Sequence, residues 1–133
     1  MPGAFYFLTE LSTTVYDYLY VRMTVFDIKN KNIDKFNLLC DRFHVEKLYA
    51  FGSSITPNFD ESNSDIDLLA IINSSDPLQK GEYLLSLWDS LEDFFDRRVD
   101  LVTPESINNP YFKKEIDLKK RLIYDRQREK ISV

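Results

Sequence analysis

The chain has 133 residues, of which 44% are hydrophobic and 29% charged, and its formal net charge is −5. This length suits one domain with a single hydrophobic core, and the composition is ordinary for a soluble globular protein. The negative charge argues against nucleic acid as a direct partner, because phosphate binding needs a basic surface. No apolar run approaches the roughly 18 residues of a membrane helix, so no membrane association is expected.

The cysteine content and the first residues favour a cytoplasmic protein. Cys40 is the only cysteine, which excludes a disulfide within the chain and suits a reducing compartment. No basic residue precedes Arg22, and the first apolar run is short, so the N-terminus is a poor match to a signal peptide. We set residues 1–22, which are rich in aromatic side chains, apart as an N-terminal extension. The domain is expected over residues 23–125, with a C-terminal tail over residues 126–133.

The first half of the domain reads as a helix and two strands. The helix lies within residues 30–45, where apolar residues recur at helical spacing and place Cys40 in the core. A strand over residues 47–51 breaks at Gly52. After a polar loop, a second strand covers residues 66–72, whose near-continuous apolar run is typical of a buried strand.

The second half begins with a long helix at Pro77. Its apolar stripe follows the i, i+3, i+4, i+7 rule and would face the core: Leu84, Leu87, Trp88, Leu91 and Phe95. A third strand within residues 97–102, a short helix from residue 104, a helix over residues 109–121 and a short strand over residues 122–125 follow. This order predicts an α/β (α+β) single domain with a short mixed central sheet and helices packed on one side.

Two aspartates mark the start of the second strand. Asp65 and Asp67 are two residues apart, so on a strand their side chains leave the same face about 6.5–7 Å apart. At an effective dielectric of about 20, two like charges about 6 Å apart repel by roughly 2.8 kcal/mol. No Lys or Arg occurs between Lys47 and Lys80 to offset this repulsion. Carboxylate oxygens without nearby His or Cys therefore predict Mg²⁺ or Mn²⁺ rather than zinc.

A third carboxylate and a glycine strengthen this interpretation. Asp100 lies inside the apolar third strand, which the long helix connects to the second. Three carboxylates at one sheet edge suit the two-metal arrangement of phosphoryl transfer. Gly52, one of three glycines, would let the backbone approach a bound group closely, and Ser53 and Ser54 add hydroxyl donors. A turn glycine followed by a helix-capping serine explains that segment equally well.

These segments together resemble the minimal nucleotidyltransferases of the DNA polymerase β superfamily, small proteins often encoded beside a HEPN-domain partner in toxin–antitoxin pairs. The resemblance covers about residues 30–125 and rests on the segments "FGSS", "SDIDLL" and "RRVDLVTPESINNPYFKKEI". It implies the fold of a small nucleotidyltransferase domain. It also implies transfer of AMP from ATP, with release of pyrophosphate, to a hydroxyl such as that of a tyrosine on a HEPN toxin, which is thereby silenced.

The resemblance also assigns roles to individual residues. Gly52 and Ser53 match the glycine and serine that hold the terminal phosphates of the nucleotide. Asp65 and Asp67 match the metal ligands of the family. Asp100 matches the third carboxylate, which completes the site for Mg²⁺ (or Mn²⁺) and helps to activate the attacking hydroxyl.

Two departures from the family pattern keep other interpretations open. Eleven residues instead of ten separate Ser53 from Asp65, and this loop contains no basic residue. The basic helix of residues 113–121 could compensate if it faces the site. A catalytically weak or inactive protein that neutralises its partner by binding alone is the main alternative, and transfer to a small acceptor such as an aminoglycoside is a further one. Homo- and hetero-oligomers are both left open.

Overall fold

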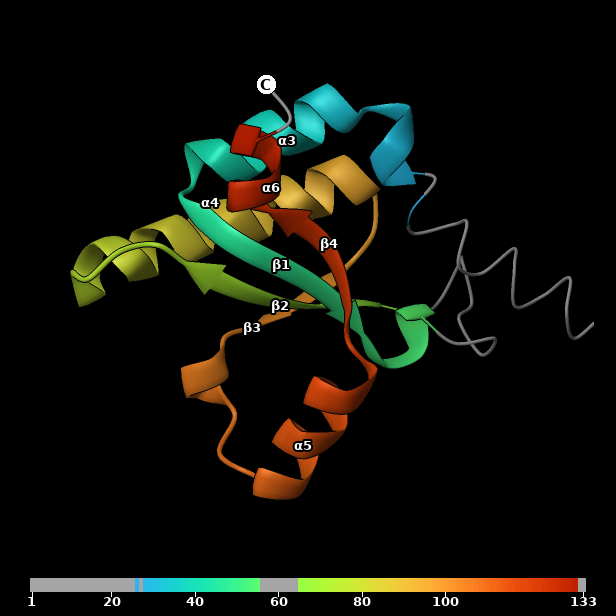
Figure 1. Cartoon of the computed structure of the whole chain (residues 1–133), viewed down its shortest axis with the longest axis vertical. Coiled ribbons are helices and arrows are strands. Elements are labelled where there is room, and N and C mark those ends of the chain that lie inside the picture. Colours follow the sequence, from blue (N-terminus) through green and yellow to red (C-terminus); the bar gives the residue numbers. More distant parts are fainter. Residues whose placement is uncertain (1–25, 27, 56–64, 132–133) are drawn as a thin grey trace, which may run out of the picture.

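A computed structural model describes residues 26, 28–55 and 65–131 of the chain (Figure 1). Each helix and strand expected from residue 33 onward is found there, with bounds that differ by a few residues at most. In chain order the elements are α3 (Ile33–Arg42), β1 (Val45–Phe51), the 3-10 turn η1 (Gly52–Ile55), β2 (Ile66–Ile72), α4 (Pro77–Phe95), β3 (Val99–Val102), the 3-10 turn η2 (Pro104–Ser106), α5 (Pro110–Lys119), β4 (Arg121–Asp125) and α6 (Arg126–Ile131).

The four strands form one mixed sheet in the order β3-β2-β1-β4. Strand β1 pairs antiparallel with β2 and with β4, whereas β2 and β3 run parallel. Parallel neighbours need a long connection, which α4 provides. The mixed sheet confirms the predicted α/β class, and the short strand expected near the C-terminus becomes its fourth member.

The main core lies between the sheet and the helices α3 and α4, which Figure 1 shows on one face of the sheet. Alternate residues of the central strands point into it, as the period of two along a strand requires. Cys40 is fully buried there, as predicted. The best-buried members of this core are Phe36, Cys40, Val45, Leu48, Ile66, Leu68, Leu87 and Leu91.

The opposite face of the sheet carries a second, smaller cluster. Phe51 and Leu69 point away from the main core and meet Ile116 of α5. Figure 1 shows α5 on the far side of the sheet from α3 and α4. The helices are thus divided between the two faces: α3 and α4 follow the one-sided arrangement expected from the sequence, and α5 covers the other face. This placement decides what faces the carboxylates.

Helix starts follow the expected chemistry. The side chain of Asp76 accepts a hydrogen bond from the backbone N–H of Leu78, and Pro77 occupies the first turn of α4. Asn109 caps α5 by accepting hydrogen bonds from the N–H groups of Tyr111 and Phe112. Both caps satisfy backbone donors that a helix leaves open at its N-terminus.

The segment from residue 126 onward, expected as a tail, begins with helix α6. Arg126 is only 9% exposed. Its guanidinium donates to the backbone oxygen of Val45 at 3.0 Å and to both the side chain and the backbone oxygen of Asp41. Arg126 thereby ties α6 to β1 and α3.

None of the helices that the structure describes has the length and the apolar character of a membrane span.

The expectation that Trp88 is a core residue is wrong. Its side chain is 38% exposed, and its indole N–H donates to the backbone oxygen of Val99 at 2.7 Å. Glu92, one turn further along α4, accepts a hydrogen bond from the N–H of Val99 at 3.0 Å. Because β3 is an edge strand, these two side chains occupy backbone groups that no neighbouring strand pairs.

Candidate active site

Two of the three predicted carboxylates lie side by side on parallel strands. Asp67 of β2 and Asp100 of β3 are directly paired in the strand register. Neighbouring strands are about 4.8 Å apart, so the two side chains leave the same face as close neighbours. Asp65 precedes β2 by one residue and is half-buried. The side chain period of two places it on the same face as Asp67.

The electrostatics of this edge agree with the close approach. Burial, followed by the charges of Asp100 and then Asp65, raises the pKa of Asp67 from the usual 3.8 to about 6. Each of these causes disfavours the ionised form of the carboxyl group. A site that gathers negative charge in this way favours a bound cation.

Gly52 lies against the Asp67 carboxylate. Phe51, the last residue of β1, is paired with Asp67 in the register of β1 and β2, and the chain turns immediately into η1. Gly52 has a φ of +67°, a left-handed backbone conformation that residues other than glycine rarely adopt. A Cβ atom at this position would overlap Oδ2 of Asp67. Both the backbone and the carboxylate therefore require glycine here.

Ser53 and the loop after it are described only in part. Ser53 lies within η1, directly after Gly52. Its role in holding phosphates stays a prediction, and the loop residues 56–64 lie outside the described residues.

Two cavities flank the carboxylates and share Asp100. The first, of about 450 Å³, is lined by Gly52, Asp67 and Asp100 together with residues of α5. The second, of about 540 Å³, is lined by Asp65, Asp100, Trp88, Glu92, Arg98 and Val99. Asp100, which is exposed, is thus accessible from both sides.

Helix α5 forms one wall of the first cavity. Its lining residues recur at i, i+3, i+4 and i+7, which places them on a single face of the helix. They are Phe112, Glu115, Ile116 and Lys119. The sequence analysis named the basic helix but none of these residues as part of the site. Their helical spacing is visible in the sequence, but it does not indicate which face meets the sheet.

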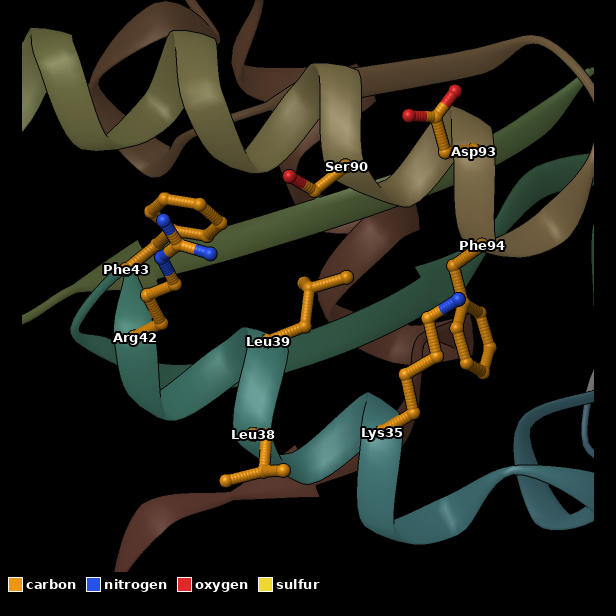
Figure 2. Close-up of a pocket in the computed structure, with 8 residues that line it drawn as sticks. All are labelled: Lys35, Leu38, Leu39, Arg42, Phe43, Ser90, Asp93 and Phe94. Atoms are coloured by element: carbon orange, nitrogen blue, oxygen red, sulfur yellow. The ribbon is translucent and has the colours of Figure 1, made fainter.

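A separate cavity of about 310 Å³ lies between α3 and α4 (Figure 2). It shares no lining residue with the two cavities at the carboxylates. Figure 2 shows Lys35 and Arg42 on α3 with Asp93 on α4, set among apolar side chains. This groove brings none of the predicted site residues together.

The donor set fits Mg²⁺ or Mn²⁺. Asp65, Asp67 and Asp100 offer only carboxylate oxygens, and the absence of a Cβ at Gly52 makes room for the Asp67 carboxylate itself. Among the described residues, no group of three His, Cys, Asp or Glu side chains is arranged closely enough to hold a metal ion by itself. Protein sites for Mg²⁺ commonly use one or two carboxylates together with substrate phosphates, which agrees with the paired Asp67 and Asp100.

Comparison with known proteins identifies the family. The sequence profile of the family described as "Polymerase beta, Nucleotidyltransferase" matches residues 31–129, about three quarters of the chain. The chain belongs to the polymerase β nucleotidyltransferase family. The match spans η1, all three carboxylates and α5, so the site described above lies within the family domain. Membership makes the protein a nucleotidyltransferase-like enzyme and confirms the family predicted from the sequence.

Curated relatives support the same assignment. A Methanocaldococcus jannaschii protein named "Putative protein adenylyltransferase MJ1379" is 36% identical over 80 residues, which are 60% of this chain and 78% of the relative. A second protein of that organism, MJ0128, carries the same description. It is 33% identical over 94 residues, 71% of this chain and 92% of the relative.

The solved structures that the chain matches include two toxin–antitoxin complexes. One contains a tri-AMPylated Shewanella oneidensis HEPN toxin with an MNT antitoxin; the likeness has a TM-score of 0.44 at 21% identity and covers 77% of this chain and 76% of the other. The other is a toxin–antitoxin structure with AMP-PNP, with a TM-score of 0.48 at 22% identity and coverage of 74% and 77%.

Proposed function

We propose that this nucleotidyltransferase-family protein transfers AMP from ATP to a hydroxyl group on a partner protein. The observation that carries the proposal is the register of Asp67 and Asp100, which sets two carboxylates side by side next to Gly52. Family membership supports nucleotidyl transfer. The names of the two Methanocaldococcus relatives support a protein as the acceptor.

The residues divide the work of the reaction between them. Together with the phosphates of the nucleotide, Asp65, Asp67 and Asp100 would hold Mg²⁺ or Mn²⁺, which, when bound, would offset the negative charge on the phosphates and on the attacking oxygen. Gly52 makes room for the Asp67 carboxylate at the turn into η1. Ser53, the next residue of η1, would hold the terminal phosphates, as the family resemblance implies. Positioning and electrostatics thus account for most of the proposed catalysis.

The proposed step is a single displacement at phosphorus. The acceptor oxygen forms a bond to the α-phosphorus of ATP, the bond between that phosphorus and the bridging α–β oxygen breaks, and pyrophosphate leaves. The hydroxyl proton passes to the Asp100 carboxylate and from there to water. Because Asp100 lines both cavities, it can face a nucleotide in the cavity beside Gly52 and an acceptor entering from the cavity beside Trp88.

For the partner we propose a HEPN-domain toxin with an acceptor tyrosine, so that the protein acts as an antitoxin. This step rests on the family resemblance noted in the sequence. The use of ATP and the single cysteine favour the cytoplasm as the place of action.

The test is a labelling experiment with a matched control. The purified protein is incubated with Mg²⁺ and α-labelled ATP, with and without the product of the neighbouring gene as candidate partner, and label on protein is read on a gel. We expect label on the partner, its loss in Asp67→Asn, and its retention in Asp89→Asn, which makes the same chemical change at an exposed position of α4. Equal labelling by Asp67→Asn and the wild-type protein would overturn the proposal.

Neutralisation by binding alone is the second candidate function. The observation that favours it is the loop of residues 54–64, which contains no Lys or Arg to meet a triphosphate. In this case the double variant Asp65→Asn, Asp67→Asn would still neutralise the toxin in cells and form a stable complex with it. If the double variant no longer neutralises the toxin, this function is ruled out.

A further inference from the structure

Helix α5 presents one basic side chain to the cavity beside Gly52. The segment of residues 113–121 contains five Lys or Arg residues. Of the described residues that line the cavity, Lys119 is the only Lys or Arg. Lys120 instead pairs with Asp117 at 3.1 Å and lies over the ring of Tyr49, 4.4 Å from its centroid.

Lys119 forms a weak, solvent-exposed ion pair with Glu115. Its Nζ lies 3.1 Å from Oε1 of Glu115, one turn earlier on α5. The two side chains are 66% and 61% exposed. An exposed pair at this spacing stabilises a helix only weakly, because water and salt screen it. A more highly charged anion entering the cavity can therefore draw Lys119 away from Glu115.

A triphosphate bound in this cavity needs a positively charged side chain in addition to the metal ion. Asp67, Asp100 and Glu115 are the other charged residues among the described lining. A nucleoside triphosphate carries about four negative charges, of which one divalent cation offsets two. The loop of residues 54–64 adds no Lys or Arg. Among the described residues of the lining, Lys119 is therefore the one that can pair with the remaining negative charge of the phosphates.

We propose that Lys119 binds the phosphate oxygens of the nucleoside triphosphate, and that Glu115 holds Lys119 while the site is empty and opposes nucleotide binding. This inference rests on the proposed function, since it takes the cavity beside Gly52 as the nucleotide site. It assigns to one face of α5 the positive charge that the loop of residues 54–64 lacks. Glu115 and Lys119 then affect nucleotide affinity in opposite directions, which separates this role from that of a merely structural ion pair.

The test compares three variants of exposed α5 residues by calorimetric titration with ATP and Mg²⁺. Lys119→Met should weaken ATP binding about tenfold through loss of a charge-assisted hydrogen bond. Lys114→Met removes the same charge from a residue of α5 that does not line the cavity, and should change the affinity less than about twofold. Glu115→Gln should tighten binding about two- to threefold, because it removes a like charge from the site. In the transfer reaction the loss should appear in KM, with kcat nearly unchanged.

The outcomes separate this inference from the proposed function. If the wild-type protein binds ATP and Lys119→Met binds it as tightly as Lys114→Met does, the role of Lys119 is refuted and the proposed function stands. If Glu115→Gln weakens binding as Lys119→Met does, the pair acts only through the helix, and the inference is again refuted. If the wild-type protein binds no ATP in the presence of Mg²⁺, both the inference and the transfer reaction are overturned.

Discussion

The Asp67 carboxylate occupies the space that a Cβ atom at residue 52 would need. Gly52 and Asp67 lie at the ends of the antiparallel strands β1 and β2, where Phe51 and Asp67 are paired in register. The glycine therefore makes room for the Asp67 carboxylate and also allows the left-handed turn that follows β1. Stability and site geometry are coupled at this one contact.

Gly52→Ala should destabilise the protein by at least about 1 kcal/mol, since it forces a left-handed backbone on alanine and displaces the Asp67 side chain. Urea unfolding measures this cost. Gly81→Ala is the control: it lies within α4, and a Cβ there would meet nothing within 4 Å. It should stabilise the protein by about 0.5–1 kcal/mol, the usual gain for alanine over glycine in a helix. Equal effects of the two substitutions would contradict the crowding at Gly52.

Asp67→Asn should make the metal-free protein more stable at pH 7.5. The pKa of Asp67 is raised to about 6 in the folded state, so between pH 3.8 and 6 the folded state binds more protons than the unfolded state. Stability therefore falls as the pH rises through this window, and the penalty is fully present above it. We expect a gain of about 1 kcal/mol for the variant, a value reduced for solvent screening at this half-exposed group.

Thermal unfolding in the presence of a chelator, at pH values from 4 to 8, tests this sign. The difference between Asp67→Asn and the wild-type protein should shrink toward pH 4. Addition of Mg²⁺ should stabilise only the wild-type protein, because a ligand that binds the folded state raises its stability. A variant less stable than the wild-type protein at pH 7.5 would show that the carboxylate is favourably paired without metal.

Arg126→Met should cost about 2–3 kcal/mol of unfolding free energy. The substitution removes the donors to the backbone oxygens of Val45 and Asp41 and leaves these acceptors without their partner. Arg126→Lys should recover only part of the loss, because an ammonium cannot reproduce the planar fork of the guanidinium. Asp41→Asn should cost less than about 0.5 kcal/mol, since the Asp41 side chain is 66% exposed. Chemical denaturation of the three variants would reveal the order; a large effect of Asp41→Asn would assign the stability to the ion pair instead.

Trp88→Phe should cost about 1 kcal/mol through loss of the hydrogen bond to the backbone oxygen of Val99. The ring keeps most of its packing, so the loss reports mainly on the N–H group. Because Val99 precedes Asp100 on the edge strand, amide hydrogen exchange in β3 should become faster in the variant. Leu85→Phe, at a 70% exposed position of the same helix, should leave that exchange unchanged. Unaltered exchange in Trp88→Phe would mean that the indole does not support the strand.

Much of the fold follows from local patterns in the sequence. The apolar residues of α3 and α4 recur at helical spacing, and the run of β2 is bounded by polar residues, so the elements and the burial of Cys40 were predictable. Asp65 and Asp67 share a face because a strand has a period of two. The family, too, was recognisable from short segments around Gly52, Asp67 and Asp100, and the profile match confirms it.

Only the tertiary structure decided which of these faces meet. Asp67 and Asp100 are paired because β2 and β3 run parallel in one register, a contact between residues far apart in the chain. Periodicity shows that a helix has faces, but it does not show that α5 covers the second face of the sheet and that Lys119 lines the cavity beside Gly52. For the same reason the stripe of α4 did not reveal that Trp88 reaches the exposed edge of β3. Local sequence determines the element and its faces, whereas the packing of distant segments determines what each face touches.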